Sequence, residues 1–382
     1  MTRPGRESPG SVQEENHRDR LTGTDREEIQ KGNIGKRMAE QKLYFECDYM
    51  KGAHPSILNR MVETNRMATI GYGVDEISES ARAKIRKACG CENAMVQFLV
   101  GGTQTNAVVI DAFLRPWQGV IAAQTGHISV HEAGAIEAGG HKVLTLSSTR
   151  GKIFPEEAEL YVKDFYQDVN HEHMVMPGMV YLSQPTEYGT LYSREELAQF
   201  RRVCDKYHMA LYIDGARLAY ALACPENTVT LSDLAALCDA FYIGGTKCGA
   251  LFGEAVVIPD PQRIPAFFTL VKQHGALLAK GRLLGIQFDT LFTDDLYMEI
   301  GKTAIEAAGR IQAALVRKGY RLWQESPTNQ LFIIMENSKL EEFGRKVEYS
   351  FWEKYDDSHT VIRLVTDWGT TPEETEALIS IL

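Results

Sequence analysis

The residues of this chain that are best suited to covalent chemistry are an aspartate and a lysine, each placed after an apolar run. Asp214 ends the run that begins at Leu211, and Lys247 follows the run that begins at Phe241. Short apolar runs of this kind predict buried strands, and open α/β sheets place their chemistry where such strands end. We therefore expect Asp214 and Lys247 to lie at neighbouring strand ends.

A lysine and a carboxylate in this arrangement suit pyridoxal phosphate (PLP). The lysine amine forms a Schiff base with the PLP aldehyde, and a buried aspartate keeps the ring nitrogen protonated, so that the ring can accept electrons. The separation of 33 residues between Asp214 and Lys247 leaves room for one helix and one strand. We expect the Schiff base at Lys247 and a contact between Thr246 and the cofactor phosphate.

A turn rich in small residues at Gly101–Gln104 separates a predicted strand from a helical run. Backbone N–H groups at such a turn are free to bind an anion, and the helix dipole adds positive potential. Most turns of this kind are only helix caps, so the position upstream of the aspartate and the lysine is what favours a phosphate site at Gly102, Thr103 and Gln104. The strand end at Ser183–Thr186 is a further candidate rim of the cofactor pocket.

The stretches Asp214-Gly-Ala-Arg217 and Thr246-Lys247 resemble the threonine aldolase and β-eliminating lyase family of fold-type-I PLP enzymes, in the aspartate-aminotransferase-like superfamily. The resemblance implies an α/β fold, with a large PLP-binding domain around a mostly parallel seven-stranded sheet and a smaller C-terminal α+β domain. Strands that alternate with helices from about residue 94 to 258 independently predict a parallel sheet.

The predicted domain boundaries rest on the family resemblance and on the alternation of strands and helices. We place the large domain at residues 39–290 and the small domain at 291–382. Residues 1–38 are polar, mix both charge signs and lack hydrophobic periodicity, which predicts a disordered N-terminal arm. The alternative for this arm is a segment that binds a partner protein.

The resemblance assigns roles to further residues. His127, with Glu132 downstream, matches a family pattern, which implies that His127 stacks on the cofactor ring near the substrate β-hydroxyl, where imidazole can exchange a proton. Arg217 and Arg363 match arginines that hold the substrate carboxylate, a task suited to guanidinium. Tyr72, in a loop flanked by glycines, is a candidate substrate contact.

Some positions depart from the family pattern. His131 is an addition, and it lies four residues after His127, a spacing that also suits zinc on a helix. Because no clear third ligand follows in the sequence, no metal is expected and His131 is interpreted as a packing residue. Cys47-Asp48 stands where relatives often have Ser-Asp, so a serine contact to the substrate carboxylate is lost or replaced.

These residues together predict a PLP-dependent lyase that cleaves a β-hydroxy-α-amino acid, such as L-threonine or allo-threonine, to glycine and an aldehyde. Lys247, His127 and Asp214 are the expected catalytic residues. The same residues would support β-elimination, transamination or racemisation, depending on which bond lies perpendicular to the ring. A non-catalytic binding protein with this fold is a further alternative.

The composition narrows the remaining classes of function. The chain of 382 residues has a net charge of −10 and no basic stripe, which argues against a nucleic-acid surface. No run is long and apolar enough to span a bilayer, and the first residues lack the apolar core of a signal peptide. Seven cysteines without disulfide-like spacing fit the cytoplasm. The resemblance implies a homodimer or homotetramer.

Overall fold

The computed structural model describes residues 42–382, so the predicted arm at 1–38 lies outside the described residues. The large sheet is built from β2 (Met95–Leu99), β3 (Gln118–Ala123), β4 (Val143–Leu146), β5 (Met176–Ser183), β6 (Ala210–Asp214), β7 (Ala240–Gly244) and β8 (Glu254–Ile258). Its strands lie in the order β2-β8-β7-β6-β5-β3-β4. Among the described residues, β8 is the one strand of this sheet that runs antiparallel to both of its neighbours, β2 and β7. The other neighbouring strands pair in parallel. The predicted seven-stranded, mostly parallel sheet is confirmed.

Each central strand contributes alternate side chains to the two faces of this sheet. Leu211 and Ile213 of β6 belong to one apolar cluster, while Ala210 and Tyr212 belong to the other. Helices cover both faces because each presents an apolar stripe to the sheet. The first face packs against α3 (Glu76–Cys89), α7 (Pro155–Gln167), α8 (Arg194–Tyr207), α10 (Leu231–Leu237) and α12 (Arg282–Leu291), and the second against α4 (Gly102–Phe113) and α11 (Phe267–Gln273).

Shorter helices connect these elements and carry several site residues. They are α2 (Pro55–Thr64), α5 (His127–Val130), α6 (Ala135–Ala138), α9 (Leu218–Ala223) and the 3₁₀ turns at His171–His173 and Pro261–Arg263. Helix α4 already begins at Gly102, inside the turn predicted at Gly101–Gln104, and α5 begins at His127. Both begin directly after an extended glycine, Gly101 or Gly126, so the polar turn residues themselves form the first helical turn.

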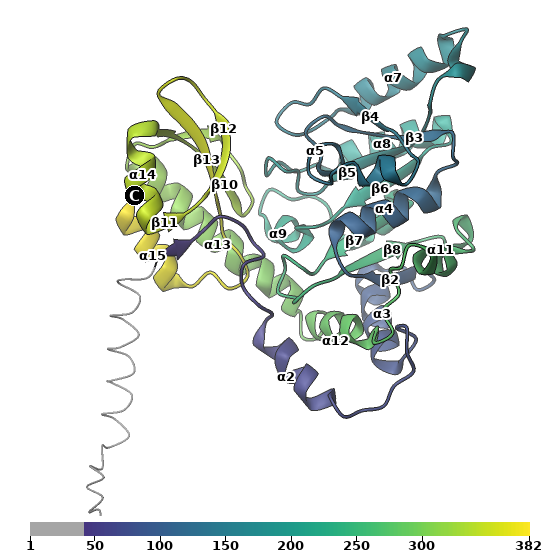
Figure 1. The fold of residues 1–382 in the computed structure, drawn as a ribbon, viewed down its shortest axis with the longest axis horizontal. Helices are drawn as coiled ribbons and strands as arrows, with labels where there is room; N and C mark the ends of the chain where they lie inside the picture. The colour runs from purple at the N-terminus through teal and green to yellow at the C-terminus, as the bar shows by residue number, and fades with distance from the viewer. Residues whose placement is uncertain (1–41) are drawn as a thin grey trace, which may run out of the picture. The chain divides into compact units, whose positions relative to one another are not determined.

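The C-terminal part contains a second sheet of four antiparallel strands in the order β12-β13-β10-β9. These strands are β9 (Arg321–Gln324), β10 (Gln330–Glu336), β12 (Ser350–Lys354) and β13 (His359–Val365), and the helices are α13 (Leu296–Arg317), α14 (Asn337–Lys346) and α15 (Pro372–Ile381). Helix α13 packs against both α9 and α15 (Figure 1). The short strands β1 (Leu43–Tyr44) and β11 (Val347–Glu348) pair in parallel. The predicted domain boundary at residue 290 falls at the end of α12.

Within residues 42–382, none of the helices combines the length and the apolar character that a membrane span requires. The parallel strands of the large sheet all run in one direction, so the segments that follow β3, β5, β6 and β7 meet at one edge of the sheet. The polar residues singled out from the sequence follow these same strands. This edge is therefore the place to look for a site.

Candidate active site

The ends of β6 and β7 lie in direct backbone contact. The N–H of Gly244 donates to the carbonyl oxygen of Gly215 at 3.0 Å. A Cβ atom on Gly215 would clash with the carbonyl oxygen of Tyr242, so only glycine permits this approach. Because Asp214 is the last residue of β6 and Lys247 follows β7, the contact brings the predicted acid and the predicted amine to one edge of the sheet.

Asp214 is buried and accepts hydrogen bonds on both carboxylate oxygens. Tyr181 donates to Oδ2 at 2.6 Å and Tyr242 donates to Oδ1 at 2.5 Å, while the amide of Asn106 donates to Oδ2 at 3.1 Å. Burial by itself would raise the pKa of Asp214, but the charge of His127 and the tyrosine hydrogen bonds outweigh burial and hold this pKa below its usual value. The carboxylate therefore stays ionised and can stabilise a cation.

Lys247 lines a cavity of about 590 Å³ together with His127, Arg217 and Arg363. Among residues 42–382, no group forms a hydrogen bond or an ion pair with the Lys247 amine at contact distance. Burial lowers the pKa of Lys247, and the nearby charge of Arg217 lowers it further, against the opposing effect of Asp48. A lysine of this kind offers a larger fraction of neutral amine, which is the nucleophilic form.

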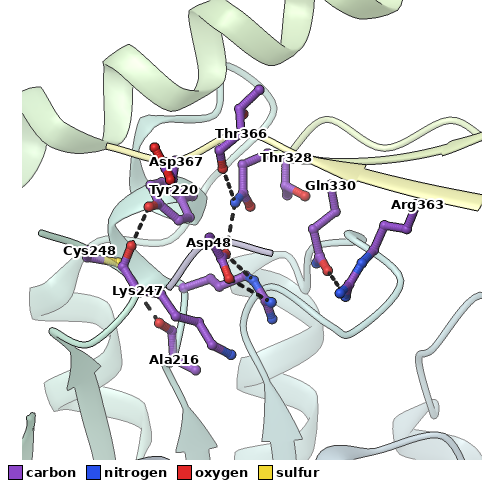
Figure 2. A network of polar contacts seen from close by, with 12 residues as sticks. Asp48, Ala216, Tyr220, Lys247, Cys248, Thr328, Gln330, Arg363, Thr366 and Asp367 are labelled. Carbon is purple, nitrogen blue, oxygen red and sulfur yellow. Dashed lines mark hydrogen bonds and ion pairs between the residues drawn. The ribbon is translucent and has the colours of Figure 1, made fainter. Parts of the chain in front are cut away.

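Arg217 lines the same cavity and is held by a buried carboxylate. Its Nε donates to Asp48 Oδ2 at 2.6 Å and its Nη2 donates to Oδ1 at 3.0 Å, while Asn329 Nδ2 donates to Oδ2 at 3.0 Å. Figure 2 shows Asp48, which accepts from both Arg217 and Asn329, near Lys247, whose backbone carbonyl accepts a hydrogen bond from the Tyr220 hydroxyl. Asp48 thus fixes the edge of the guanidinium that carries Nε and Nη2. Nη1 donates to no group among the described residues, so it is available to a ligand in the cavity.

Replacing Asp48 with asparagine is expected to lower the free energy of unfolding by about 3–5 kcal/mol at neutral pH, because it leaves a buried guanidinium without its counter-charge. Burial would raise the pKa of Asp48, but Arg217 and Lys247 outweigh it and keep this pKa low. The stabilisation is therefore present at neutral pH and is lost as the pH falls through this lowered pKa. Urea unfolding at several pH values should show the two proteins converging in acid. Asp357→Asn, at an exposed position, is the control.

Arg363, on β13, lines the other side of the cavity. Its Nη1 donates to Gln330 Oε1 at 3.1 Å and its Nη2 donates to Ser350 Oγ at 3.2 Å, while the guanidinium carbon lies 5.2 Å from the centre of the Trp352 ring. Its Nε is buried without a partner among residues 42–382. Burial, with a contribution from the charge of Arg217, lowers the pKa of Arg363 to about 10. Two arginines that face one cavity favour an anionic ligand such as a carboxylate.

His127 is the first residue of α5 and lies at the cavity wall. Its Nδ1 is 2.7 Å from Glu132 Oε1, and because a carboxylate accepts, the ring proton is placed on Nδ1 and Nε2 is the acceptor. The backbone N–H of His127 donates to Glu187 Oε1 at 3.0 Å. His131 also lines the cavity, with its ring centre 5.7 Å from that of His127. In residues 42–382, no group of three or more potential ligands is arranged to hold a metal ion.

The predicted phosphate turn forms the first turn of α4, where backbone N–H groups have no partner within the helix. A Cβ atom on Gly102 would lie 3.3 Å from the hydroxyl of Tyr242, which itself donates to Asp214. The N-terminus of α4 is therefore beside the acid that would face the cofactor ring. The roles of Gly102, Thr103 and Gln104 in binding phosphate stay predictions.

Two other predicted residues are not among those that line this cavity. The hydroxyl of Thr246 donates to Glu254 Oε1 at 2.7 Å, so it points toward the start of β8. Tyr72 is 45% exposed, and its ring faces the amine of Lys272 at 4.8 Å. The contact of Thr246 with phosphate and that of Tyr72 with substrate stay predictions.

Sequence reasoning missed several residues that the structure places at the site. Tyr181 and Tyr242 stand within apolar runs that predict buried strands, and a buried tyrosine hydroxyl needs a hydrogen-bond partner, which was the available signal. Glu187 and Trp352 line the cavity from a loop and from β12. Glu187 directly follows the predicted pocket rim at Ser183–Thr186, and this position was the available signal. Local sequence contained no indication that Trp352 would reach the site.

The observed groups fit PLP. Lys247 provides an amine with a lowered pKa for the aldehyde, and Asp214 provides a carboxylate with a lowered pKa for the ring nitrogen. The N-terminus of α4 provides backbone donors for the phosphate, and His127 lines the same cavity as Lys247 and the two arginines. A covalently held ring requires an unpaired amine, and a cationic ring requires a buried carboxylate. Lys247 meets the first requirement, and Asp214, held by two tyrosines, meets the second.

The chain is similar to characterised proteins over most of its length. The family model described as beta-eliminating lyase matches residues 47–329. The low specificity L-threonine aldolase of Pseudomonas sp. (strain NCIMB 10558) is 29% identical over 316 residues, which cover 81% of this chain and 89% of that protein. The low specificity L-threonine aldolase of Pseudomonas aeruginosa is also 29% identical, over 73% of this chain and 80% of that protein.

Solved structures show the same relationship. The threonine aldolase of Leishmania major is 42% identical with a TM-score of 0.86, and the alignment covers 89% of this chain and 98% of that one. An aspartate aminotransferase of Thermus thermophilus, 12% identical with a TM-score of 0.65 over 97% of this chain and 99% of that one, shares the fold alone. The predicted family, fold class and cofactor are confirmed. The chain therefore belongs to the beta-eliminating lyase family of fold-type-I, PLP-dependent enzymes.

Proposed function

We propose that this protein cleaves β-hydroxy-α-amino acids of the threonine and allo-threonine type to glycine and an aldehyde. The observation that carries the proposal is the cavity in which Lys247, His127, Arg217 and Arg363 meet. The family and the relatives named L-threonine aldolase support the same reaction. When bound, PLP supplies the electron sink that cleavage of a carbon–carbon bond requires.

The residues of this chain bind and orient the amino acid. Arg217 and Arg363 hold the substrate carboxylate between them, which fixes Cα relative to the Lys247 amine. His127 offers Nε2 to the β-hydroxyl or to a water beside it, since Glu132 keeps the proton on Nδ1. Asp214 stays ionised through its tyrosine hydrogen bonds and supports positive charge on the ring nitrogen.

Incubation of the purified protein with L-threonine, L-allo-threonine and phenylserine tests this function. We expect glycine and the matching aldehyde in equal amounts, measured by amino-acid analysis and by an aldehyde-coupled assay. Release of pyruvate and ammonia from serine or cysteine, with no glycine from any of the three substrates, would contradict the proposal and favour β-elimination.

We also propose that the protein forms a homodimer or homotetramer. The loop and helix around α2 expose several apolar side chains, and an exposed patch of this kind marks an interaction surface: Leu58, Val62, Met67, Ile70 and Val74. The double variant Val62→Asp, Ile70→Asp is expected to lower the mass measured by light scattering. Val169→Asp, at a position that is 92% exposed outside this patch, is the control and should leave the mass unchanged.

For localisation we propose the cytoplasm. All seven cysteines lie in the described residues, and none of them forms a disulfide. Reduced thiols are typical of proteins kept in a reducing compartment.

A further inference from the structure

Glu187 places a carboxyl group in the active cavity that the proposed mechanism does not use. It lies in the loop after β5, is only 9% exposed, and lines the cavity with Lys247 and Arg217. Its Oε1 accepts a hydrogen bond from Ser183 Oγ at 2.7 Å and another from the backbone N–H of His127 at 3.0 Å. Its own backbone N–H also forms a hydrogen bond with the carboxyl group. Among residues 42–382, no residue other than Glu187 itself donates to Oε2, so this oxygen has room for a ligand in the cavity.

The charges around this carboxyl group favour exchange of a proton. Burial raises the pKa of Glu187, and the negative charge of Asp214 adds to this, while Ser183 and His127 oppose it in part. Efficient proton transfer needs a group whose pKa lies near the operating pH, and a raised glutamate pKa moves toward that condition. The titratable and charged groups that interact with it are His127, Tyr181, Tyr188, Tyr192, Asp214 and Arg217.

The two candidate proton acceptors at the cavity wall differ in their bonding. The imidazole of His127 is tied through Nδ1 to the buried Glu132, and its backbone N–H is tied to Glu187. These bonds hold the ring in place beside the substrate. The carboxyl group of Glu187 is also held, but Ser183 and His127 both donate to Oε1, so Oε2 can take a proton without loss of either of these bonds.

We propose that Glu187, instead of His127, is the catalytic residue that accepts the β-hydroxyl proton of the substrate, and that His127 orients the hydroxyl group by a hydrogen bond to it. This inference rests on the proposed function. As the Cα–Cβ bond breaks, the O–H bond breaks and the aldehyde C=O bond forms, and the proton passes to Glu187 Oε2. The electron pair of the Cα–Cβ bond stays with the Cα fragment. That fragment takes up one proton to become glycine, so the overall reaction consumes and releases none.

Glu187→Gln is the central test, because glutamine keeps the shape and one acceptor oxygen but cannot accept the proton. We expect kcat for L-threonine cleavage to fall by about 10²-fold or more, the range for a lost general base. Exchange of the glycine Cα proton with D₂O, followed by NMR, involves no hydroxyl group and should be unchanged, as should the absorbance of bound PLP. Glu195→Gln, at an exposed position on α8, is the matched control for both reactions.

The pH profile gives a second readout. In the wild type, kcat/KM for cleavage should rise with pH through the Glu187 pKa as the carboxylate forms, and Glu187→Gln should lose this limb. Glu187→Asp retains a carboxyl group, so it should keep this rise of kcat/KM with pH at a lower rate. If the glutamine variant fails to bind PLP, the aspartate variant serves as the test in its place. The inference is overturned if the glutamine variant keeps both cleavage and the limb, or if glycine exchange falls in parallel with cleavage. Absence of glycine from the wild type would instead overturn the proposed function.

Discussion

Replacing Lys247 with alanine is expected to lower aldehyde release from L-threonine by about 10⁴-fold, the upper end of the range for a lost acid–base group. The structure gives the reason: the Lys247 amine lies in the cavity with a lowered pKa and no partner at contact distance among the described residues. Without it, the cofactor has no covalent attachment to the chain. A coupled aldehyde assay, at saturating added PLP, measures the loss directly.

The absorbance spectrum separates a chemical role of Lys247 from a structural one. The wild type should be yellow, with a visible band that borohydride abolishes, and Lys247→Ala should lack the band that reports attachment. Lys247→Arg keeps a positive charge without a nucleophilic amine and should be equally inactive. Lys163→Ala, on the exposed side of α7, is the control and should behave as the wild type. Full activity in the alanine variant would contradict the assignment of Lys247.

Asp214→Asn is expected to lower kcat by about 10²–10³-fold, as for the loss of one preorganised electrostatic contact. An amide carries no charge to support a cationic ring nitrogen. It also presents an NH2 group to one of the two tyrosines, Tyr181 or Tyr242, whose hydroxyls both donate to the carboxylate in the wild type. We therefore expect weaker binding of PLP as well, measured by absorbance titration of the apoprotein.

Graded variants sharpen this second test. Tyr181→Phe removes one donor and leaves the carboxylate, so the pKa of Asp214 should move up toward its ordinary value and kcat should fall by less than in the asparagine variant. Asp356→Asn removes a carboxylate that is outside the cavity and controls for the change in net charge. An Asp214→Asn protein with unchanged kcat and unchanged affinity for PLP would show that another group serves the ring nitrogen.

The sequence by itself determined the large sheet and the position of its chemistry. Apolar runs that alternate with amphipathic helices predicted the strands β2 to β8, because each strand and each helix shows its own period in the side chains that it buries. The strand ends at Asp214 and before Lys247 were located in the same way. Local patterns are sufficient here, since the carboxyl ends of parallel strands meet at one edge.

Only the tertiary structure decided which side chains share the cavity and what holds them. Asp48 and Arg217 are 169 residues apart in the chain, and no local pattern pairs them. The β12 residue Trp352 reaches the cavity from a segment without a motif, and Arg363 on β13 meets Arg217 there only through packing. The physical reason is that periodicity reports the burial of one element, whereas the partner of a buried charge depends on how separate elements pack. The sequence therefore fixed the edge of the sheet at which the site forms, while packing selected the acids and arginines that meet there.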